Sequence, residues 1–410
     1  MSIGVTMHIN VPPLFSALRR NPSGSLLVLA QIAITLAVLC NTASIVAHAI
    51  ARMDLPSGFD TLDTFVIDVE SQSNRFDISS AEREDAAYLR GLPDVVAATI
   101  TSGRPLTHDG TFDGMGRAPG TTGASVLSSK LPVDEQGLSA LGVPLVAGRN
   151  FRADEVVADS ATGTPQQSGE IIVSESLARA LFPDGHALGS TVYNGGTNPL
   201  TIIGITRDFM GPQGDQPSYN VYLTPEMSGA YGFYELFVRA RPGRRDIVQR
   251  IANRHIAAAH PDAVIAFSQT MADARQLMDA DNRNMTIFLS AVTALMIAVC
   301  CLGMFGLTAF NVNSRIRQIG VRRAVGARKR DIISHFVAES ALILGAGAVL
   351  GSVLALALGQ WLSDHYGEPR LDLAYVLASI VALWAIGQLA AWQPARRAAS
   401  VPPSVATRTV

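Results

Sequence analysis

The chain has 410 residues, of which 48% are hydrophobic and only 16% are charged, and its formal net charge is -2. Ordinary soluble domains carry about 25% charged residues, so the composition excludes an ordinary soluble domain over the whole length and indicates membrane spans. The three cysteines, Cys40, Cys300 and Cys301, all lie in apolar stretches and indicate neither a disulfide framework nor a zinc-binding spacing.

Four long stretches contain no Asp, Glu, Lys or Arg: residues 21–51, 284–314, 340–363 and 373–395. Each is longer than the about 20 apolar residues that a helix needs to cross a bilayer. One such stretch would also fit a buried helix of a soluble protein, but four together favour a membrane protein. The sequence predicts transmembrane helices over residues 25–50, 284–310, 336–362 and 372–392.

The first stretch could also be a cleaved signal peptide, because it follows Arg19 and Arg20 and ends in Ala47-His48-Ala49. A signal peptide has an apolar core of about 7–15 residues, and this stretch is much longer. We therefore predict a retained span.

Basic residues near the ends of the spans predict the orientation, because cytoplasmic loops carry an excess of Lys and Arg. The N-terminal segment, residues 1–24, and the tail, residues 393–410, are basic and are predicted to be cytoplasmic. The loop of residues 311–335 carries seven basic residues and one acid before the third span, so it is also predicted to be cytoplasmic. The short loop of residues 363–371 then faces outside. The resulting prediction is a multi-pass protein of a bacterial cytoplasmic membrane.

The segment between the first two spans, residues 51–283, contains 29 of the 34 acidic residues. Short β-branched runs alternate in it with amphipathic helices, which predicts an α+β extracytoplasmic domain. Predicted strands cover residues 65–69, 170–173, 200–206 and 235–239, and predicted helices cover 244–259 and a segment that begins at a capping box of Ser79 and Glu82. Two stretches rich in Gly, Ser and Thr, residues 107–130 and 157–169, are predicted to be solvated loops.

The last helix of this domain, residues 271–283, contains no Gly or Pro before the second span. Nothing in the sequence therefore breaks the helix at the membrane surface. We expect one continuous helix that can carry motion between the outer domain and the membrane.

No enzyme signature occurs in the sequence. It has no G-x-x-x-x-G-K-[ST] phosphate loop, so ATP is expected to bind to a partner and no cofactor or metal is predicted for this chain. His255 and His260 are five residues apart, a poor spacing for shared metal ligation, and are interpreted as surface histidines. Except for His48, the four charge-free stretches contain no Asp, Glu, His, Lys or Arg, which disfavours an ion-coupled carrier.

Small residues recur every four positions along the third span, at Gly347, Gly351, Ala355 and Gly359. Such a stripe lets another helix approach closely. The partner helix could belong to this chain or to a second copy, and the pattern favours neither.

Four segments resemble one protein family. Residues 316–332 read IRQIGVRRAVGARKRDI and are similar to the R-E-I-G-[IV]-R-[KR]-A-[LV]-G-A-x-[RK]-x-[DE]-I stretch of MacB/FtsX-type ABC permeases. Residues 141–151 read LGVPLVAGRNF, residues 174–189 contain SESLA, LFP and LG, and residues 394–399 read PARRAA, all similar to the same family. Gln318 departs from the pattern, which usually has Glu there.

The resemblance implies a permease subunit whose cytoplasmic loop contacts a separate ATPase and whose outer domain has porter-like halves with an inserted lobe. The implied coupling residues are Arg317, Ile319, Gly320, Arg322, Arg323, Gly326, Ala327, Arg328 and Asp331. Other implied partners are a second permease, in a homodimer or heterodimer, an extracytoplasmic adaptor and membrane lipid, but no nucleic acid. Fused exporters of the family carry their ATPase domain before the first span, so we expect this chain to resemble the unfused permeases.

Two alternatives stay open. The family also contains regulators of cell-envelope hydrolases, which the sequence does not separate from transporters. The chain could also be a membrane-anchored sensor whose basic loop binds anionic lipid. Apolar Ile316, Ile319 and Ala324 interleave with the arginines and give this loop a face to bury on protein, which favours the permease. The substrate cannot be inferred from the sequence.

Overall fold

The computed structural model describes residues 22–73, 76–108, 110–120, 125–158, 169–196, 198–212, 218–227, 232–326, 328–366 and 370–400. The chain divides into two compact units. The outer unit is the continuous segment Asp54–Asp281, and the membrane unit combines the chain before and after it.

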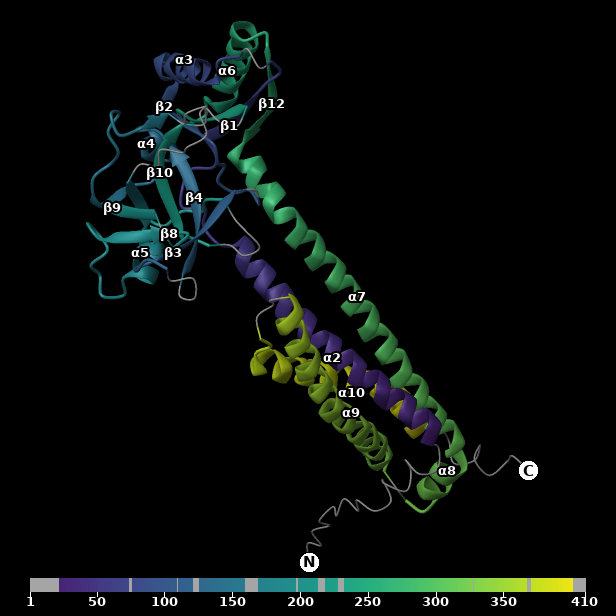
Figure 1. Ribbon diagram of the computed structural model, residues 1–410. Helices are drawn as coiled ribbons and strands as arrows, with labels where there is room; N and C mark the ends of the chain where they lie inside the picture. The colour runs from purple at the N-terminus through teal and green to yellow at the C-terminus, as the bar shows by residue number, and fades with distance from the viewer. Residues whose placement is uncertain are drawn as a thin grey trace, which may run out of the picture. The chain divides into compact units, whose positions relative to one another are not determined.

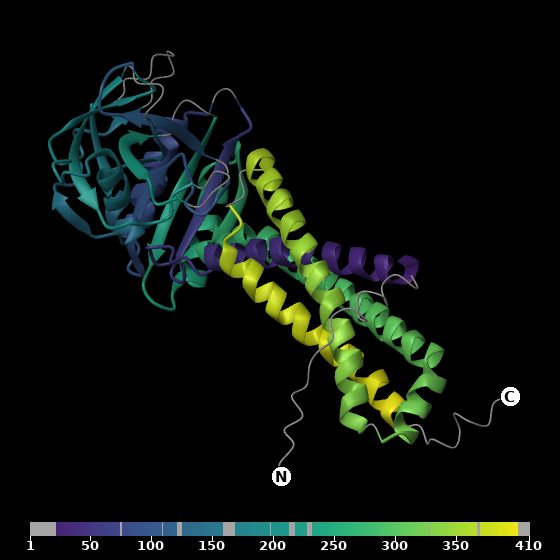
Figure 2. The same cartoon turned by 90° about the horizontal axis from the view of Figure 1, so that it is seen from below.

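The membrane unit consists of four long helices, α2 (Pro22–Met53), α7 (Met271–Ser314, from Asn282 onward), α9 (Lys329–Tyr366) and α10 (Leu373–Ala399), and the short α8 (Ile316–Ala324). All four long helices are long and apolar enough to cross a membrane, which confirms the prediction of four spans. Helix α9 lies beside both α2 and α10 (Figures 1 and 2). Half of the most apolar window of α2 is buried, more than in the other three, so α2 is the most enclosed of the four long helices.

The stripe of small residues on α9 packs against α2. Gly347, Gly351, Ala355 and Gly359 are all buried. A Cβ at Gly351 would lie 2.9 Å from the carbonyl oxygen of Ala33, so only the missing side chain allows this approach. The amide nitrogen of Asn41 on α2 donates to the carbonyl oxygen of Ala355 over 3.1 Å. The helix that the stripe accommodates is therefore in the same chain.

The outer unit is built on a 12-stranded sheet. Its strands, in spatial order, are β12 (Ala263–Thr270), β1 (Thr64–Ser71), β11 (Phe233–Ala240), β2 (Val95–Thr101), β4 (Val126–Val133), β3 (Thr111–Gly116), β8 (Thr191–Asn194), β9 (Asn198–Thr206), β7 (Glu170–Ser174), β10 (Val221–Met227) and β6 (Val157–Ala158). Strand β5 (Leu145–Gly148) pairs with β9. Most neighbours are antiparallel, but β7 runs parallel to β9, and β10 runs parallel to β4 and β6.

Helices cover two parts of this sheet. Helices α3 (Ile78–Gly91) and α6 (Arg245–Ala259) pack over β1, β2, β11 and β12 around a core that includes Leu89, Leu236 and Ile256 (Figure 1). Helix α5 (Glu175–Leu181) packs over strands β3 and β7 to β10 around a second core that includes Leu177. The unit thus has two helix-covered lobes, and the α+β prediction is confirmed.

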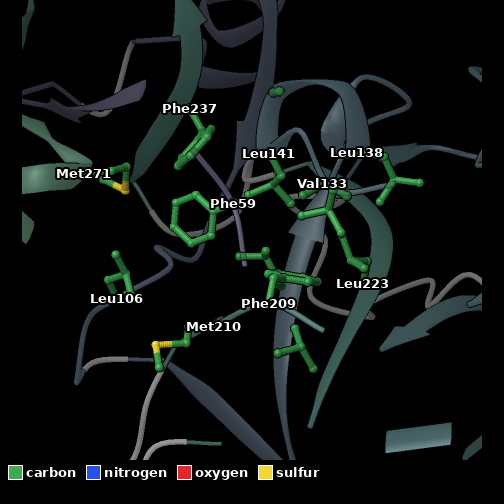
Figure 3. Packing of buried hydrophobic residues seen from close by; sticks show 14 of the residues in the cluster. Phe59, Leu106, Val133, Leu138, Leu141, Phe209, Met210, Leu223, Phe237 and Met271 are labelled. Atoms are coloured by element: carbon green, nitrogen blue, oxygen red, sulfur yellow. The ribbon is translucent and has the colours of Figure 1, made fainter. Parts of the chain in front are cut away.

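A third core lies on the other face of β1 and β11 and holds the start of α7. This core includes Phe59, Phe237 and Leu106, and Met271 lies beside them (Figure 3). Met271 is fully buried and is the first residue of α7, and α4 (Gly137–Leu141) contributes Leu138 and Leu141 to the same core. Helix α7 then continues to Ser314 without a break, which confirms the predicted continuous helix.

The start of α3 differs from the prediction. Asp77, not Ser79, caps the helix, and its carboxylate accepts from the backbone nitrogen of Ser80. Glu82, the other half of the predicted capping box, is buried under the helix. The start of α5 is capped by Ser174, whose hydroxyl oxygen accepts from the backbone nitrogen of Leu177.

The two predicted loops also need correction. Residues 107–130 contain β3 and the first part of β4, which pair antiparallel, and Met115 of β3 is fully buried in the lobe under α5. The sequence did not indicate these strands because its many Gly, Ser and Thr residues obscure the alternation of apolar and polar residues that is typical of a strand with one buried face. In the second stretch, Val157–Ala158 forms β6, and residues 159–168 lie outside the described part of the chain.

The interpretation of His255 and His260 as surface histidines holds only in part, because their side chains are 30% and 10% exposed. Both Nε2 atoms approach Oδ1 of the buried Asp85, at 3.6 Å and 3.2 Å respectively. The hydroxyl of Tyr234 donates to the other oxygen of Asp85 over 2.5 Å. The histidines therefore join α6 to α3 through one buried carboxylate, a contact between distant segments that their spacing in the sequence could not reveal.

Candidate coupling site

The coupling segment predicted from the sequence lies where four helices of the membrane unit meet. Helix α7 ends at Ser314, α8 follows at once, α9 begins at Lys329, and the last turns of α10 lie beside them. A small apolar cluster joins these helices: Val312, Ile319, Ile332, Phe336, Ala395 and Ala399. Because each helix contributes to this close-packed cluster, a displacement of α8 would also displace the residues of the other three helices that pack in it.

Ile319 and Gly320 form the inward side of α8. Both are buried, and Ile319 retains only 6% of its surface exposed. The apolar face that the sequence offered for a partner is therefore partly used within the chain, where Ile319 anchors α8 to α7, α9 and α10.

An ion pair also holds the α7–α8 turn. Nη1 of Arg315 lies 3.3 Å from Oε2 of Glu339 on α9, whose side chain is only 8% exposed. Burying a carboxylate without a partner costs free energy, so the ion pair holds Arg315 in this position. The charge of Arg315 is therefore paired within the chain.

The outward side of α8 is basic with two apolar residues. Arg317 and Arg322 are exposed, and between and beyond them Val321 is 59% exposed and Val325 is 84% exposed. Arg317 and Val321 are four residues apart on one face of α8, and Val325, four residues further on, follows directly after the helix ends at Ala324. The two valines were not selected from the sequence, although this spacing could have identified them.

A tight turn separates α8 from α9. Gly326 has a φ of +105°, a backbone conformation that other residues rarely adopt. The carboxylate of Asp331 accepts from the backbone nitrogen of Arg328 over 3.0 Å and so caps the start of α9. Ala327 lies outside the described residues, and the side chain of Arg323 is not described.

The site thus presents a short amphipathic helix with a buried anchor, a basic outer face and exposed valines. Such a surface suits contact with another protein, because arginine supplies orientation and small apolar residues supply buried area. In the part of the chain that the structure describes, no group of three or more His, Cys, Asp or Glu residues is placed to hold a metal ion.

Two family models match the chain. The model described as MacB-like periplasmic core domain matches residues 27–254, which is more than half of the chain. The model described as FtsX-like permease C-terminal matches residues 290–403, which include the whole coupling site.

Several curated proteins are similar in sequence. The macrolide export ATP-binding/permease protein MacB of Acinetobacter baylyi is 30% identical over 255 residues, which are 58% of this chain and 37% of that protein. The protein of the same name from Agrobacterium fabrum is 27% identical over 373 residues, which are 86% of this chain and 53% of that protein. The chain therefore spans about half the length of these relatives or less.

Two solved structures match part of the chain with low scores. The periplasmic region of MacB from Actinobacillus actinomycetemcomitans has 16% identity and a TM-score of 0.35, covering 54% of this chain and 94% of that one. The extracellular domain of the noncanonic ABC-type transporter YknZ from Gram-positive bacteria has 15% identity and a TM-score of 0.33, covering 50% of this chain and 98% of that one. On the two family models, which together cover most of the outer unit and all of the coupling site, the chain belongs to the MacB/FtsX-type family of ABC transporter permeases.

Proposed function

We propose that this chain is the membrane-spanning subunit of an ABC transporter in which a separate cytoplasmic ATPase moves the outer unit by mechanotransmission. The continuity of α7 carries this proposal. The helix begins at the buried Met271 in the core of the outer unit and ends at Ser314, next to the coupling helix α8. A single continuous helix therefore joins the coupling segment, which would receive force from the ATPase, to the outer unit, which this force would move.

The ATPase is the proposed partner of α8. The sequence contains no phosphate loop, so ATP would bind to that partner. Exposed Arg317, Arg322, Val321 and Val325 form the contact surface in this proposal, and the Ile319 anchor passes its movement to α7. Both termini and the coupling segment then lie in the cytoplasm, as the distribution of Arg and Lys indicates.

A second permease would complete the transporter, as a homodimer or a heterodimer, and an extracytoplasmic adaptor could be a further partner. The small-residue stripe of α9 is occupied by α2. The dimer contact is therefore expected to use another face of the helices. The relatives are named as macrolide export proteins, which supports transport outward or work on the cell envelope.

The docking surface can be tested with Val325→Asp. The side chain is 84% exposed, so the substitution should leave folding and membrane insertion intact while placing a carboxylate in the proposed apolar contact. We expect the ATPase recovered with the chain from native membranes to fall by about fivefold or more, because burying an unpaired charge at an interface costs at least about 1 kcal/mol.

Asn313→Asp is the matched control, since it adds the same charge at an exposed position of the adjacent helix end. It should leave recovery of the ATPase unchanged. Equal recovery with both variants would exclude α8 as the contact. Recovery of no ATPase with the wild-type chain, together with a ligand response of the outer unit, would favour the membrane-anchored sensor.

A further inference from the structure

Helix α7 is attached to the other helices of the membrane unit only over its inner half. In this unit its buried residues lie four apart on one face, at Cys300, Met304, Thr308 and Val312. None of residues 284–299 is buried. Helices α2, α9 and α10, in contrast, all pack on one another. Only 11% of the most apolar window of α7 is buried, the lowest share of the four long helices.

The contacts of this inner half are mostly apolar and have no fixed direction. Cys300 and Met304 belong to the apolar core that α2, α9 and α10 share. The hydroxyl of Thr308 donates to the carbonyl oxygen of Met304 within α7 itself. Lipid chains are as apolar as these side chains, so lipid can replace such contacts at little cost. They do not by themselves fix α7 in one position.

A charged contact at the inner end of α7 is different. Arg315 joins α7 to α8, and its Nη1 atom lies 3.3 Å from Oε2 of Glu339 on α9. In the described part of the chain, this is the only ion pair between residues 282–315 and α2, α9 or α10. The side chain of Glu339 is 8% exposed, so little water can solvate its carboxylate in place of the arginine. The pair is therefore the directional contact that sets the position of α7 on α9.

We propose that the Arg315–Glu339 ion pair is a latch, which holds α7 against α9 in the resting protein and opens when the ATPase moves α8. Glu339 is thus a positioning residue that acts through Arg315. The latch rests on the proposed function, because the ATPase supplies the force. Helix α8 follows Arg315 directly, so a displacement of α8 reaches Arg315 before it reaches the rest of α7. Once the pair opens, α7 is free to move relative to the other three long helices.

An ion pair suits this role better than an apolar contact would. Replacing a buried ion pair by apolar residues of similar volume is often neutral or stabilising, so stability alone does not account for the pair. A hydrogen-bonded pair of charges has one good geometry, and this gives α7 two distinct states, closed and open. His335 lies one turn before Glu339 on α9, near enough for their charges to interact. The carboxylate therefore has a second basic neighbour when Arg315 leaves.

The test measures the position of α7 by double electron–electron resonance between spin labels at Leu295→Cys on α7 and Val353→Cys on α9. The two side chains are 66% and 63% exposed, so the labels should not disturb packing. The three native cysteines are changed to alanine, and the labelled chain, diluted with unlabelled chain, is purified with its ATPase and placed in nanodiscs.

With the ion pair intact, we expect one distance without nucleotide and a shift to a second distance on addition of ATP, magnesium and orthovanadate. A pair with a purely structural role would not respond to nucleotide. Glu339→Gln should show the second distance without nucleotide, with the ratio of open to closed α7 raised by about tenfold or more, because Arg315 loses its charged partner.

Two comparisons separate the latch from a general loss of structure. Arg315→Glu combined with Glu339→Arg restores an opposite pair and should return the resting distance to the closed value. Asp364→Asn removes a carboxylate at an exposed position at the other end of α9 and should leave both distances as they are with the pair intact.

An unchanged distance on addition of nucleotide, in a complex that hydrolyses ATP, would overturn the latch and leave the proposed function standing. The latch would also be wrong if Glu339→Gln kept the closed distance, if Asp364→Asn opened α7 equally, or if the exchanged pair failed to close it. If no ATPase is recovered with the wild-type chain, the proposed function fails and the latch fails with it.

Discussion

At the scale of single residues, two buried carboxyl groups lie opposite each other in the outer unit. Glu235 on β11 is paired in register with Asp68 on β1, and they are 3% and 7% exposed. Each keeps one oxygen, Oε2 and Oδ1 respectively, without a hydrogen bond among the described residues. Nε of Arg104 lies 2.8 Å from the other oxygen of Glu235, and its guanidinium stacks over Phe267. The charge of Arg104 thus acts on both carboxyl groups.

Burial dominates the protonation of this pair. It raises the pKa of Glu235 to about 8, although the charge of Arg104 opposes the shift and Asp68 adds to it. Burial likewise raises the pKa of Asp68 to about 6, again opposed by Arg104 and increased by Glu70. Because the groups are adjacent, the protons belong to the pair. We expect the pair to retain a proton near neutral pH.

The raised pKa values of Asp68 and Glu235 predict that the stability of the outer unit falls as pH rises. Both pKa values are higher in the folded chain than in the unfolded chain, so the folded state binds more protons and the stabilisation, complete below about pH 4, is lost as pH rises to about 8. Protection of the backbone amides of β1 and β11 from hydrogen exchange, measured on the full chain and corrected for the intrinsic rate, should fall by roughly tenfold or more between pH 5 and pH 8.

Glu235→Gln should flatten this pH dependence, because an amide does not titrate. Glu84→Gln makes the same change at an exposed position of α3 and should keep the wild-type slope. If Glu235→Gln has the slope of the wild type, the buried pair does not control the stability of the sheet.

At the scale of elements, the contact between α2 and α9 depends on the absence of side chains. A Cβ at Gly351 would lie 2.9 Å from both the Ala33 carbonyl oxygen and the Leu36 Cβ. Gly351→Leu should therefore separate the helices and lower stability by about 1–3 kcal/mol or more, seen as a lower midpoint of thermal unfolding in detergent.

Gly345→Leu provides the comparison for this substitution. Gly345 is exposed on the same helix, and a Cβ there would meet no atom within 4 Å. Leucine also has a higher helix propensity than glycine, so this control should be neutral or slightly stabilising. Equal destabilisation by both variants would mean that the stripe does not matter for packing.

The elements also show what a single sequence can and cannot reveal. The four spans were predictable because a bilayer requires long stretches without charge. The continuation of α7 from the outer unit into the second span was predictable because residues 271–283 contain no Gly or Pro. The sequence could not tell that Ile319 packs within the chain while Val321 and Val325 stay exposed, because an apolar helical face has the same pattern whichever protein covers it. The pairing of Asp68 with Glu235 depends on strand register between distant segments, which no local pattern contains.

At the scale of the whole molecule, the proposed mechanism requires α7 to be stiff where the outer unit ends. The first turns of α7 are held in that unit: Arg275 pairs with Asp279 over 2.8 Å and donates to the carbonyl oxygen of Leu55 over 3.0 Å. Inserting two glycines after Asp279 leaves these contacts in place but weakens the helix, since glycine costs about 1 kcal/mol more than alanine in a helix. We expect loss of transport or of the envelope phenotype, with complex assembly and ATP hydrolysis retained.

Inserting two alanines at the same point separates stiffness from geometry. Both insertions lengthen and rotate the helix equally, but alanine keeps it rigid. Activity should therefore be lower with the glycines than with the alanines. Equal activity of the two variants, with the glycine helix shown to be interrupted by hydrogen exchange, would count against mechanotransmission through α7.

The burial of α2 has a consequence for the order in which the protein matures. Its neighbour α9 is synthesised much later, and the hydrogen bond between Asn41 and Ala355 joins residues 314 positions apart. At about 5–20 residues per second, a ribosome needs roughly 15–60 s for that length. During this interval Asn41 can still donate to the Ala37 carbonyl oxygen of its own helix, a contact that the finished protein retains at 2.9 Å. The side-chain amide of Asn41 therefore keeps a hydrogen bond within α2 while this helix lies in the bilayer, until the outer unit has been translocated and α9 has been inserted.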